Sequence, residues 1–431
     1  MNDAGSLGVI WGWFITGTFT MIVAMSLAEI FGITSVDLGL SQFIAGVINV
    51  WQPEVDTSVY MQYGIFVGIL LIHGVINSIA VSWNGWMNQF AFYVNMLGIL
   101  FIVVVGLSIT RPLATGSFVF SEFYNGSGFS SDGYAFLLVI LQSQYTLSGY
   151  DSAAHMSEET KNSQHGSPFG ILTAVAANAT SGFIFLIGIS FMTKDFMAQI
   201  VSEDAIQPQM VQIFVDGVGQ AWTMVFLIFV MLSIFFCGSS LTLGSSRMVY
   251  AFARDGAMPL SKHLHKLDAR TNNPVNSVWF NIVVAGVVGV LYMINSTAYE
   301  SIVSVNTIGS QLSYLVPIVL RITVARKSFS PGPWNLGRFS TIVGVLSSCW
   351  LLFTCCLFIC PTEAPITADN MNYAIAPFAF IMLLSGGYFA IWGRKWFTGP
   401  VRVVNGKEVV LGDDDDSIPS VTKEKEEISS S

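Results

Sequence analysis

The feature that most constrains the fold is the spacing of the charged residues along the chain. Residues 57–110 contain no Asp, Glu, Lys or Arg, and a helix that crosses the hydrocarbon core of a bilayer needs about 20 predominantly apolar residues. This run is long enough for two such helices. Similar charge-free runs occupy residues 162–193, 217–246, 271–299, 301–320, 339–362 and 370–393. The sequence therefore predicts a chain that crosses a membrane many times.

The composition indicates the same class of protein. Charged residues make up 10% of the chain, against about 25% in soluble domains, and the mean hydropathy is +0.62. Lipid cannot satisfy backbone donors and acceptors, so long apolar runs must form helices. A transmembrane barrel would show short alternating strands instead. We expect an all-α polytopic membrane protein.

Charge-free runs and helix breakers together predict eleven membrane spans. They are residues 7–30, 31–50, 62–81, 89–110, 134–151, 169–193, 218–244, 275–295, 299–321, 340–360 and 373–393. Asp37 lies inside the second span, and no polar loop separates this span from the first. The expected organisation is a short N-terminal segment (1–6), a membrane core (7–393) and an acidic, disordered tail (394–431), whose residues from Asp413 onward contribute −5 to the net charge of −9.

The positions of Lys and Arg predict the orientation, because these residues accumulate in cytoplasmic loops. All of them except Arg111 and Lys194 follow the fifth, seventh, ninth or eleventh span. The tail is therefore expected in the cytoplasm. With eleven spans, Met1 would then lie outside the cell, and we favour the hypothesis that a preceding helix is missing.

Motifs for other classes of function are not found in the sequence. Four of the five cysteines lie in residues 349–360, within one apolar run, and are expected to act as small buried hydrophobes. No metal-ligand spacing, nucleotide-binding loop or nucleophile motif is present. We expect no enzymatic activity, cofactor, metal or nucleic-acid partner.

The most informative segment is residues 144–160, with the sequence QYTLSGYDSAAHMSEET. An apolar helix runs into Ser148 and Gly149 and then into Asp151 and Glu158. Gly and Ser at membrane depth favour a helix that unwinds and presents carbonyl and amide groups to a buried ligand. A plain helix end followed by a polar loop fits the same spacing. The two acids are either proton carriers or interfacial residues.

This segment resembles the sixth helix of fungal amino-acid permeases of the amino acid–polyamine–organocation superfamily, in the branch of the GABA and choline permeases. Residues 238–259 are similar to the eighth helix and its following loop, and residues 11–30 to the second helix. The resemblance implies the LeuT-like fold, in which two inverted repeats each begin with a helix broken at the substrate site. The eleven spans would then match the second to the twelfth of twelve helices.

The resemblance implies a secondary active transporter in the plasma membrane. It would import a small, GABA-like amino acid or related amine with protons, by alternating access; choline is the alternative substrate. Family members have a first helix and a complete third helix; by this resemblance we expect the chain to have no counterpart of the first and, after Ile30, only the end of the third. A truncated, non-transporting relic or a nutrient-sensing membrane protein is therefore the alternative function.

The resemblance also assigns residues. The substrate site would include Tyr145, Thr146, Leu147, Ser148, Gly149 and Tyr150. Asp151 and Glu158 would serve coupling or gating by orienting the loop. Arg247 and Arg254 would form the edge of an inner gate, although basic residues after a span are first of all determinants of topology.

Other polar residues inside the spans have two possible roles. Ser239, Ser240 and Thr242 line the cavity or pack closely against another helix. His73 lies mid-span, and we expect a helix–helix hydrogen bond rather than a proton relay, because nothing nearby in sequence pairs with it.

Two glycosylation sequons, at Asn125 and Asn295, fall on the predicted outer side. The sequon at Asn178 lies inside a span and is not expected to be used.

Overall fold

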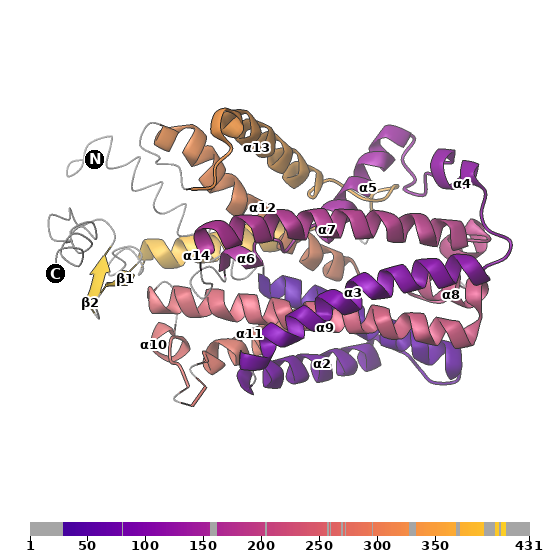
Figure 1. The fold of residues 1–431 in the computed structure, drawn as a ribbon, viewed down its shortest axis with the longest axis horizontal. Helices are drawn as coiled ribbons and strands as arrows, with labels where there is room; N and C mark the ends of the chain where they lie inside the picture. The colour runs from indigo at the N-terminus through magenta and orange to yellow at the C-terminus, as the bar shows by residue number, and fades with distance from the viewer. Residues whose placement is uncertain are drawn as a thin grey trace, which may run out of the picture.

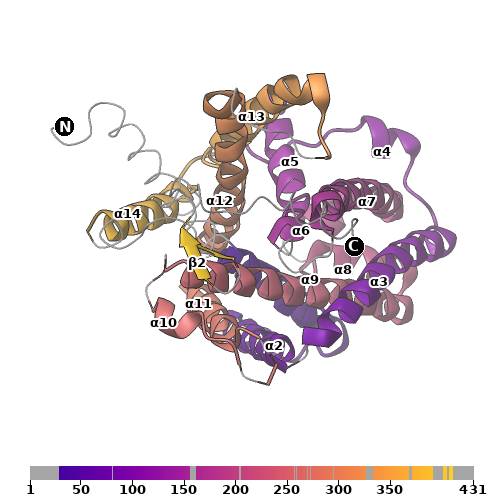
Figure 2. The ribbon, with the colours of Figure 1, turned by 60° about the vertical axis from the view of Figure 1, so that its left-hand side comes forward.

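A computed structural model describes residues 29–391, except 80, 156–161, 203–204, 257, 259, 269, 272, 295, 327–332 and 368–370, together with 401–404 and 407–410. Most of the long helices lie side by side and run along the long axis of the molecule (Figure 1). Viewed closer to this axis, they form a bundle around a central group of helices (Figure 2).

Each predicted span from the second to the eleventh has most of its residues on one helix. In chain order the helices are Glu29–Trp51, α2 (Val59–Ile79), α3 (Val81–Ile109), α4 (Gly116–Ser121), α5 (Asp132–Thr146), α6 (Ser152–His155), α7 (Ser163–Met192), α8 (Gln209–Val218), α9 (Gln220–Arg254), α10 (Ser261–Leu264), α11 (Val275–Ile294), α12 (Ser296–Ile322), α13 (Ser340–Leu357) and α14 (Ile375–Ile391). Of the first predicted span, only residues 29 and 30 belong to the described part of the chain.

Seven of the described helices are long and apolar enough to cross a membrane. They are Glu29–Trp51, α2, most of α3, α7, α9, α11 and the segment Gly337–Leu357 that contains α13. The all-α, polytopic fold class is thereby confirmed.

The helix Glu29–Trp51 is the most enclosed of these seven. Within its most apolar window 67% of the residues are buried, compared with 6% for α7. The predicted border between the first two spans, at Ile30, is wrong, because the helix runs without interruption from Glu29. Its buried apolar side chains explain this continuity, since they pack into one cluster with α2 and α11. The cluster consists of Ile30, Ile33, Leu38, Phe66, Leu70, Val278, Ile282 and Ala285.

A second cluster joins α3, α7, α8 and α9. The rings of Phe214 and Phe226 meet edge to face at 5.2 Å between centroids. Gly188 lets α7 approach α3 closely, because a Cβ at this position would lie 2.7 Å from a methyl group of Val103. Small residues at helix crossings are typical of membrane bundles, in which packing rather than the hydrophobic effect holds the helices together.

Large apolar side chains cover the outside of the bundle. Leu97, Phe183, Val287, Leu346 and Leu383 are each more than 60% exposed. They lie on α3, α7, α11, α13 and α14. Apolar surface of this extent is suited to lipid rather than to water.

Basic residues are distributed unequally between the two ends of the bundle. The short helix α10 lies at one end, and α4 and α8 lie at the other (Figure 1). Lys262 belongs to α10, and Arg254 ends α9 on the same side. At the opposite end Lys194 donates to the carbonyl of Asp216 in α8, at 2.6 Å. The described basic residues are therefore concentrated at the α10 end, in agreement with the charge pattern of the sequence.

Within the segment expected to be a disordered tail, the structure has a β-hairpin. Strands β1 (Val401–Val404) and β2 (Lys407–Val410) pair antiparallel, with Val401 opposite Val410. The sequence places Asn405-Gly406 between two valine-rich segments, a pattern typical of a two-residue hairpin turn. The expectation of a wholly unstructured tail overlooked this signal.

Candidate functional site

The helix predicted over residues 134–151 is broken. α5 ends at Thr146, and α6 begins at Ser152. Gly149 has a φ of +83°, in the left-handed region that favours glycine. The hydroxyls of Ser148 and Ser152 donate to the carbonyls of Tyr145 (2.6 Å) and Gly149 (2.8 Å). The helix therefore ends five residues before the end of the predicted fifth span, at the Ser148 and Gly149 positions that the sequence singled out, and only the short helix α6 follows in the described residues.

The break leaves backbone groups available for a ligand. Among the described residues, no hydrogen bond is made by the N–H groups of Gly149 and Tyr150 or by the carbonyls of Leu147 and Ser148. Gly149 is exposed, and Leu147, Ser148 and Tyr150 are half-buried, so the four groups are accessible. These four groups are therefore suited to a ligand that carries both a donor and an acceptor. On the α5 side, Asn178 of α7 donates to the Thr146 carbonyl at 3.1 Å.

A small cavity of about 40 Å³ adjoins the break, and most of the residues that line it are polar or charged. Ser148, Gly149 and Asp151 form one wall, and Glu29 of the most enclosed helix, Glu29–Trp51 (the central helix), contributes a second carboxylate. Ser245 of α9 and Asn306 of α12 are part of its lining as well. Several helices thus converge on the unwound segment, as expected of a site within a bundle.

Two tyrosines at the break contact different helices. The ring of Tyr150 packs against Tyr314 of α12, with 5.4 Å between the centroids. The hydroxyl of Tyr145 lies 2.8 Å from that of Ser35 in the central helix. Tyr145 also lines a larger cavity of about 660 Å³, beside Gln142 and Leu138 of α5. Cavities therefore adjoin both the end of α5 and the unwound segment that follows it.

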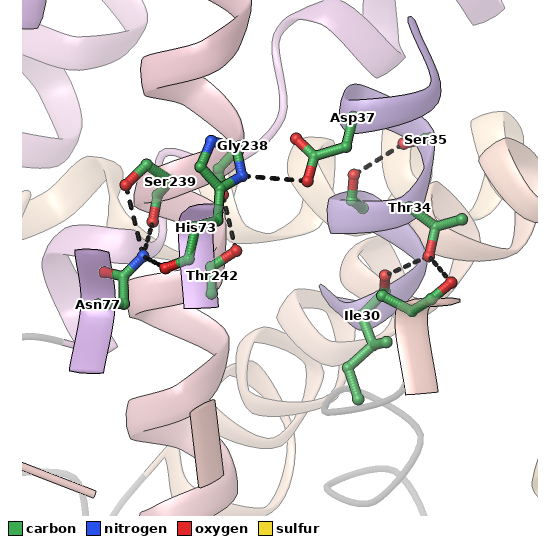
Figure 3. A network of polar contacts seen from close by, with 11 residues as sticks. Ile30, Thr34, Ser35, Asp37, His73, Asn77, Gly238, Ser239 and Thr242 are labelled. Carbon is green, nitrogen blue, oxygen red and sulfur yellow. Dashed lines mark hydrogen bonds and ion pairs between the residues drawn. The ribbon is translucent and has the colours of Figure 1, made fainter. Parts of the chain in front are cut away.

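An acid–base pair lies in the interior of the bundle (Figure 3). Asp37 Oδ2 of the central helix is 3.1 Å from His73 Nδ1 of α2, and both side chains are 0% exposed. The prediction that His73 makes a helix–helix hydrogen bond is confirmed. The identity of its partner was missed, because Asp37 is 36 positions away. Both are ionisable residues inside spans, and this is the signal that could have paired them.

Helix α9 packs directly against this pair. A Cβ on Gly238 would overlap Asp37 Oδ1 and lie 2.8 Å from His73 Cε1. The ring of Phe235 stands 4.6 Å from the imidazole ring. Among the described residues, Asp37 Oδ1 and His73 Nε2 have no hydrogen-bond partner.

Polar side chains continue from the pair towards the α10 end. Asn77 of α2 donates to the carbonyl of Ser239 in α9 at 3.2 Å. Asn273, in the loop before α11, donates to the carbonyl of Asn77. Arg247 Nη1 in turn donates to Asn273 Oδ1 at 3.1 Å. Arg247 therefore joins α9 to α2 through an asparagine.

The other predicted residues of α9 make polar contacts within their own segment or with α3. Ser240 donates to Asn88 Oδ1 of α3 at 2.8 Å, and Thr242 donates to the carbonyl of Gly238 at 2.9 Å. The ion pair of Arg254 with Asp255 is longer, at 3.5 Å. Neither Arg247 nor Arg254 is among the described residues that line the small cavity.

The remaining site predictions concern loops. Asn125 lies between α4 and α5, and its amide donates to the carbonyl of Phe129 (2.8 Å) and to Asp132 (3.0 Å). Glu158 and Asn295 lie outside the described residues. Asn178 is inside α7, as expected for an unused sequon.

Comparison with known proteins gives a consistent result. A family model described as amino acid permease matches residues 14–384. The amino-acid permease BAT1 of Arabidopsis thaliana is 33% identical over 93% of this chain and 88% of its own length. The GABA-specific permease of Saccharomyces cerevisiae is 25% identical over 98% of this chain and 82% of its own. Amino-acid permease 2 of Neurospora crassa is 25% identical, with coverages of 93% and 81%.

These matches include plant and fungal proteins, with the higher identity for the plant protein, so they do not place the chain in a fungal branch. The proteins are named as permeases, which are membrane transporters and not enzymes. The family match covers most of the chain and the helices that form the break. The chain belongs to the amino acid permease family.

Proposed function

We propose that the chain is a secondary active transporter that imports a small, GABA-like amino acid or related amine with protons, by alternating access. The observation that carries this proposal is the segment after α5, in which the N–H groups of Gly149 and Tyr150 and the carbonyls of Leu147 and Ser148 make no hydrogen bond to the described residues, beside a cavity that two carboxylates line. Substrate sites of secondary transporters are typically built on such discontinuous helices near the midplane of the membrane.

The chemistry of the break suits a zwitterion. The carbonyls of Leu147 and Ser148 are acceptors for an ammonium group, and the N–H groups of Gly149 and Tyr150 are donors for a carboxylate. The carboxyl groups of Glu29 and Asp151 line the same cavity, which favours a substrate with a cationic end. The printed name of the yeast relative, a GABA-specific permease, supports the same class.

One observation favours choline as a second candidate substrate. The rings of Tyr150 and Tyr314 lie 5.4 Å apart beside the break. A quaternary ammonium group is bound through aromatic faces rather than through hydrogen bonds. The two substrates therefore make different demands on the site, and uptake distinguishes them.

A second function is favoured by the length of the matches. The match to BAT1 extends over 454 residues, whereas it covers 93% of the 431 residues here. The relative thus has additional residues inside the matched stretch. A loss after Ile30, where the central helix continues without a break, fits a relic or nutrient-sensing protein that binds substrate without carrying it.

The end of the bundle that carries α10 is proposed to face the cytoplasm, with the tail on the same side and the protein in the plasma membrane. This orientation is supported by the basic residues at that end. The loop with Asn125 would then lie outside the cell.

The experiment is uptake by yeast that lacks its own permeases and expresses the full chain. Labelled GABA, choline and the standard amino acids are compared with cells that carry an empty vector. The proposal predicts that GABA or a similar small amino acid enters fastest. Uptake of choline alone would assign the other substrate, and binding without uptake would support the sensing function.

A further inference from the structure

The Asp37–His73 pair lies at membrane depth. At 1.5 Å of rise per residue, Asp37 lies about 12 Å from Glu29 and about 21 Å from Trp51 along its helix. Both side chains are fully buried between three helices. An ionisable group in such a place is expensive and generally serves ion or proton movement.

The charge of the pair depends on one proton. With a single proton shared between the carboxyl group and the ring, the pair is neutral, either as carboxylate with imidazolium or as acid with neutral imidazole. Without that proton it carries a negative charge. A net charge is strongly unfavourable at a site with no exposure to water. The enclosed pair therefore keeps its proton and releases it only in a conformation that admits water.

The geometry provides a place for the proton to leave. Nδ1 of His73 faces Asp37 Oδ2, so the other ring nitrogen is the free position. Neither His73 Nε2 nor Asp37 Oδ1 has a partner among the described side chains and backbone groups. Water that reached either atom would meet an unsatisfied donor or acceptor and could exchange the proton.

The pair is also connected to the break in α5. Ser35, two residues before Asp37, is hydrogen-bonded to Tyr145, just before the unwound segment. Gly238 of α9 packs on the pair, and α9 further along lines the small cavity with Ser245. A change in the charge of the pair thus acts on two helices that bound the break.

Other ionisable groups near the pair titrate above neutral pH in their ordinary state. Among the described residues, α9 presents the thiol of Cys237, next to Gly238, and α5 presents the hydroxyl of Tyr145 through Ser35. The nearest described cation on these elements, Arg247, is occupied with Asn273 at the α10 end. Asp37 and His73 are therefore the acid and the base at this place that can share a proton.

We propose that Asp37 and His73 together are the proton-binding site that couples substrate movement to the proton gradient. This inference rests on the proposed transport function and adds the residues that carry the proton. One proton enters the pair from the outer side, crosses with the substrate and leaves to the cytoplasm, which returns the pair to its deprotonated state.

The test uses the purified full-length protein in liposomes that contain a pH-sensitive dye. The probe is a mixture of GABA, choline and the standard amino acids with labelled tracers. Acidification of the lumen on addition of the mixture reports proton movement. Exchange of labelled for unlabelled probe, at equal pH on both sides, reports substrate movement without net proton transfer.

Wild-type protein should show both signals. Asp37→Asn and His73→Gln should each lose acidification and retain exchange. Ser41→Ala is the matched control, because Ser41 is equally buried on the same helix and donates only to the Leu38 carbonyl, at 2.7 Å. It should retain both signals.

Three results would overturn the inference. Acidification at the wild-type rate in both variants would show that the pair does not carry the proton. Loss of exchange in both variants, with Ser41→Ala intact, would assign the pair to the substrate path or the fold. Exchange without acidification in the wild type would leave transport standing but remove the coupling. Absence of exchange in the wild type would instead contradict the proposed transport function.

Discussion

The hydroxyl groups of Tyr145 and Ser35 lie 2.8 Å apart and join the last turn of α5 to the most enclosed helix of the bundle. Gly149 follows Tyr145 by four residues and opens the break, whereas Asp37 follows Ser35 by two and contacts His73. This hydrogen bond is therefore a direct link between the unwound segment and the buried acid–base pair.

Removal of this hydrogen bond should weaken transport. A neutral hydrogen bond contributes about 1 kcal/mol, or about fivefold in an equilibrium constant. Tyr145→Phe and Ser35→Ala should each raise the KM for uptake by about this factor, and the double variant should be no worse than either single one. Additive effects in the double-mutant cycle would show that the two hydroxyls act independently.

Gly149→Ala should impair uptake through the backbone alone. A Cβ at this position meets nothing within 4 Å, but the φ of +83° is strained for alanine, at a cost of about 1–2 kcal/mol. Gly182→Ala is the control, since Gly182 is helical in α7 and also has open space around it. Equal initial rates of uptake for the two variants would contradict a role for the left-handed residue.

Gly238→Ala should destabilise the bundle, because its methyl group would overlap Asp37 Oδ1. Overpacking of this kind costs about 1–3 kcal/mol. Thermal unfolding in detergent should show a lower Tm for this variant. Gly39→Ala, on the helix of Asp37 with nothing within 4 Å, should leave the Tm unchanged or slightly higher. A Tm for Gly238→Ala equal to that of Gly39→Ala would mean that the close approach is not required.

The loop before α11 depends on Asp268. Hydrogen bonds from the N–H groups of Thr271 and Arg270 and from the Thr271 hydroxyl lower the pKa of Asp268 below its usual range. The order that this carboxylate gives is therefore present above about pH 4 and is lost as the pH falls through the lowered pKa.

Asp268→Ala should accordingly increase cleavage by trypsin after Arg270 at neutral pH, while Asp56→Ala, an exposed acid in the loop between Trp51 and Val59, should not. Wild-type protein should become equally open to pepsin only at strongly acidic pH. Mass spectrometry of the fragments measures both effects. Unchanged cleavage in Asp268→Ala would show that the turn does not order this loop.

The Asn125 sequon tests the orientation of the bundle. If the α4–α5 loop faces the outside, protein from yeast should shift on a gel after treatment with an N-glycosidase, and Asn125→Gln should remove the shift. A wild-type protein without any shift would argue against this orientation or against use of the sequon.

The sequence was sufficient for features that depend on local chemistry. The positions of the spans follow from runs without charge, and the break at Ser148 and Gly149 follows from small residues at membrane depth. Both features are local: the thickness of the bilayer sets the length of each apolar run, and glycine adopts a left-handed conformation without help from distant residues.

Features that depend on tertiary contacts could not be predicted from neighbouring residues in the sequence. The pairing of Asp37 with His73 requires knowledge that the central helix crosses α2 at that level, which neither residue's neighbours reveal. The continuity through Ile30 is also set by packing, since apolar contacts with α2 and α11 extend across the predicted border. The hairpin at 401–410 was missed for another reason: the prediction of a disordered tail was based on the run of acidic residues that follows the hairpin.

The most direct measurement is the accumulation of labelled GABA over time in permease-deficient yeast that expresses the full chain, in acidic medium, with and without a protonophore. Proton-coupled transport predicts an internal concentration above that of the medium, abolished by the protonophore. No accumulation above the empty vector, with the protein located at the plasma membrane, would contradict import of a GABA-like substrate.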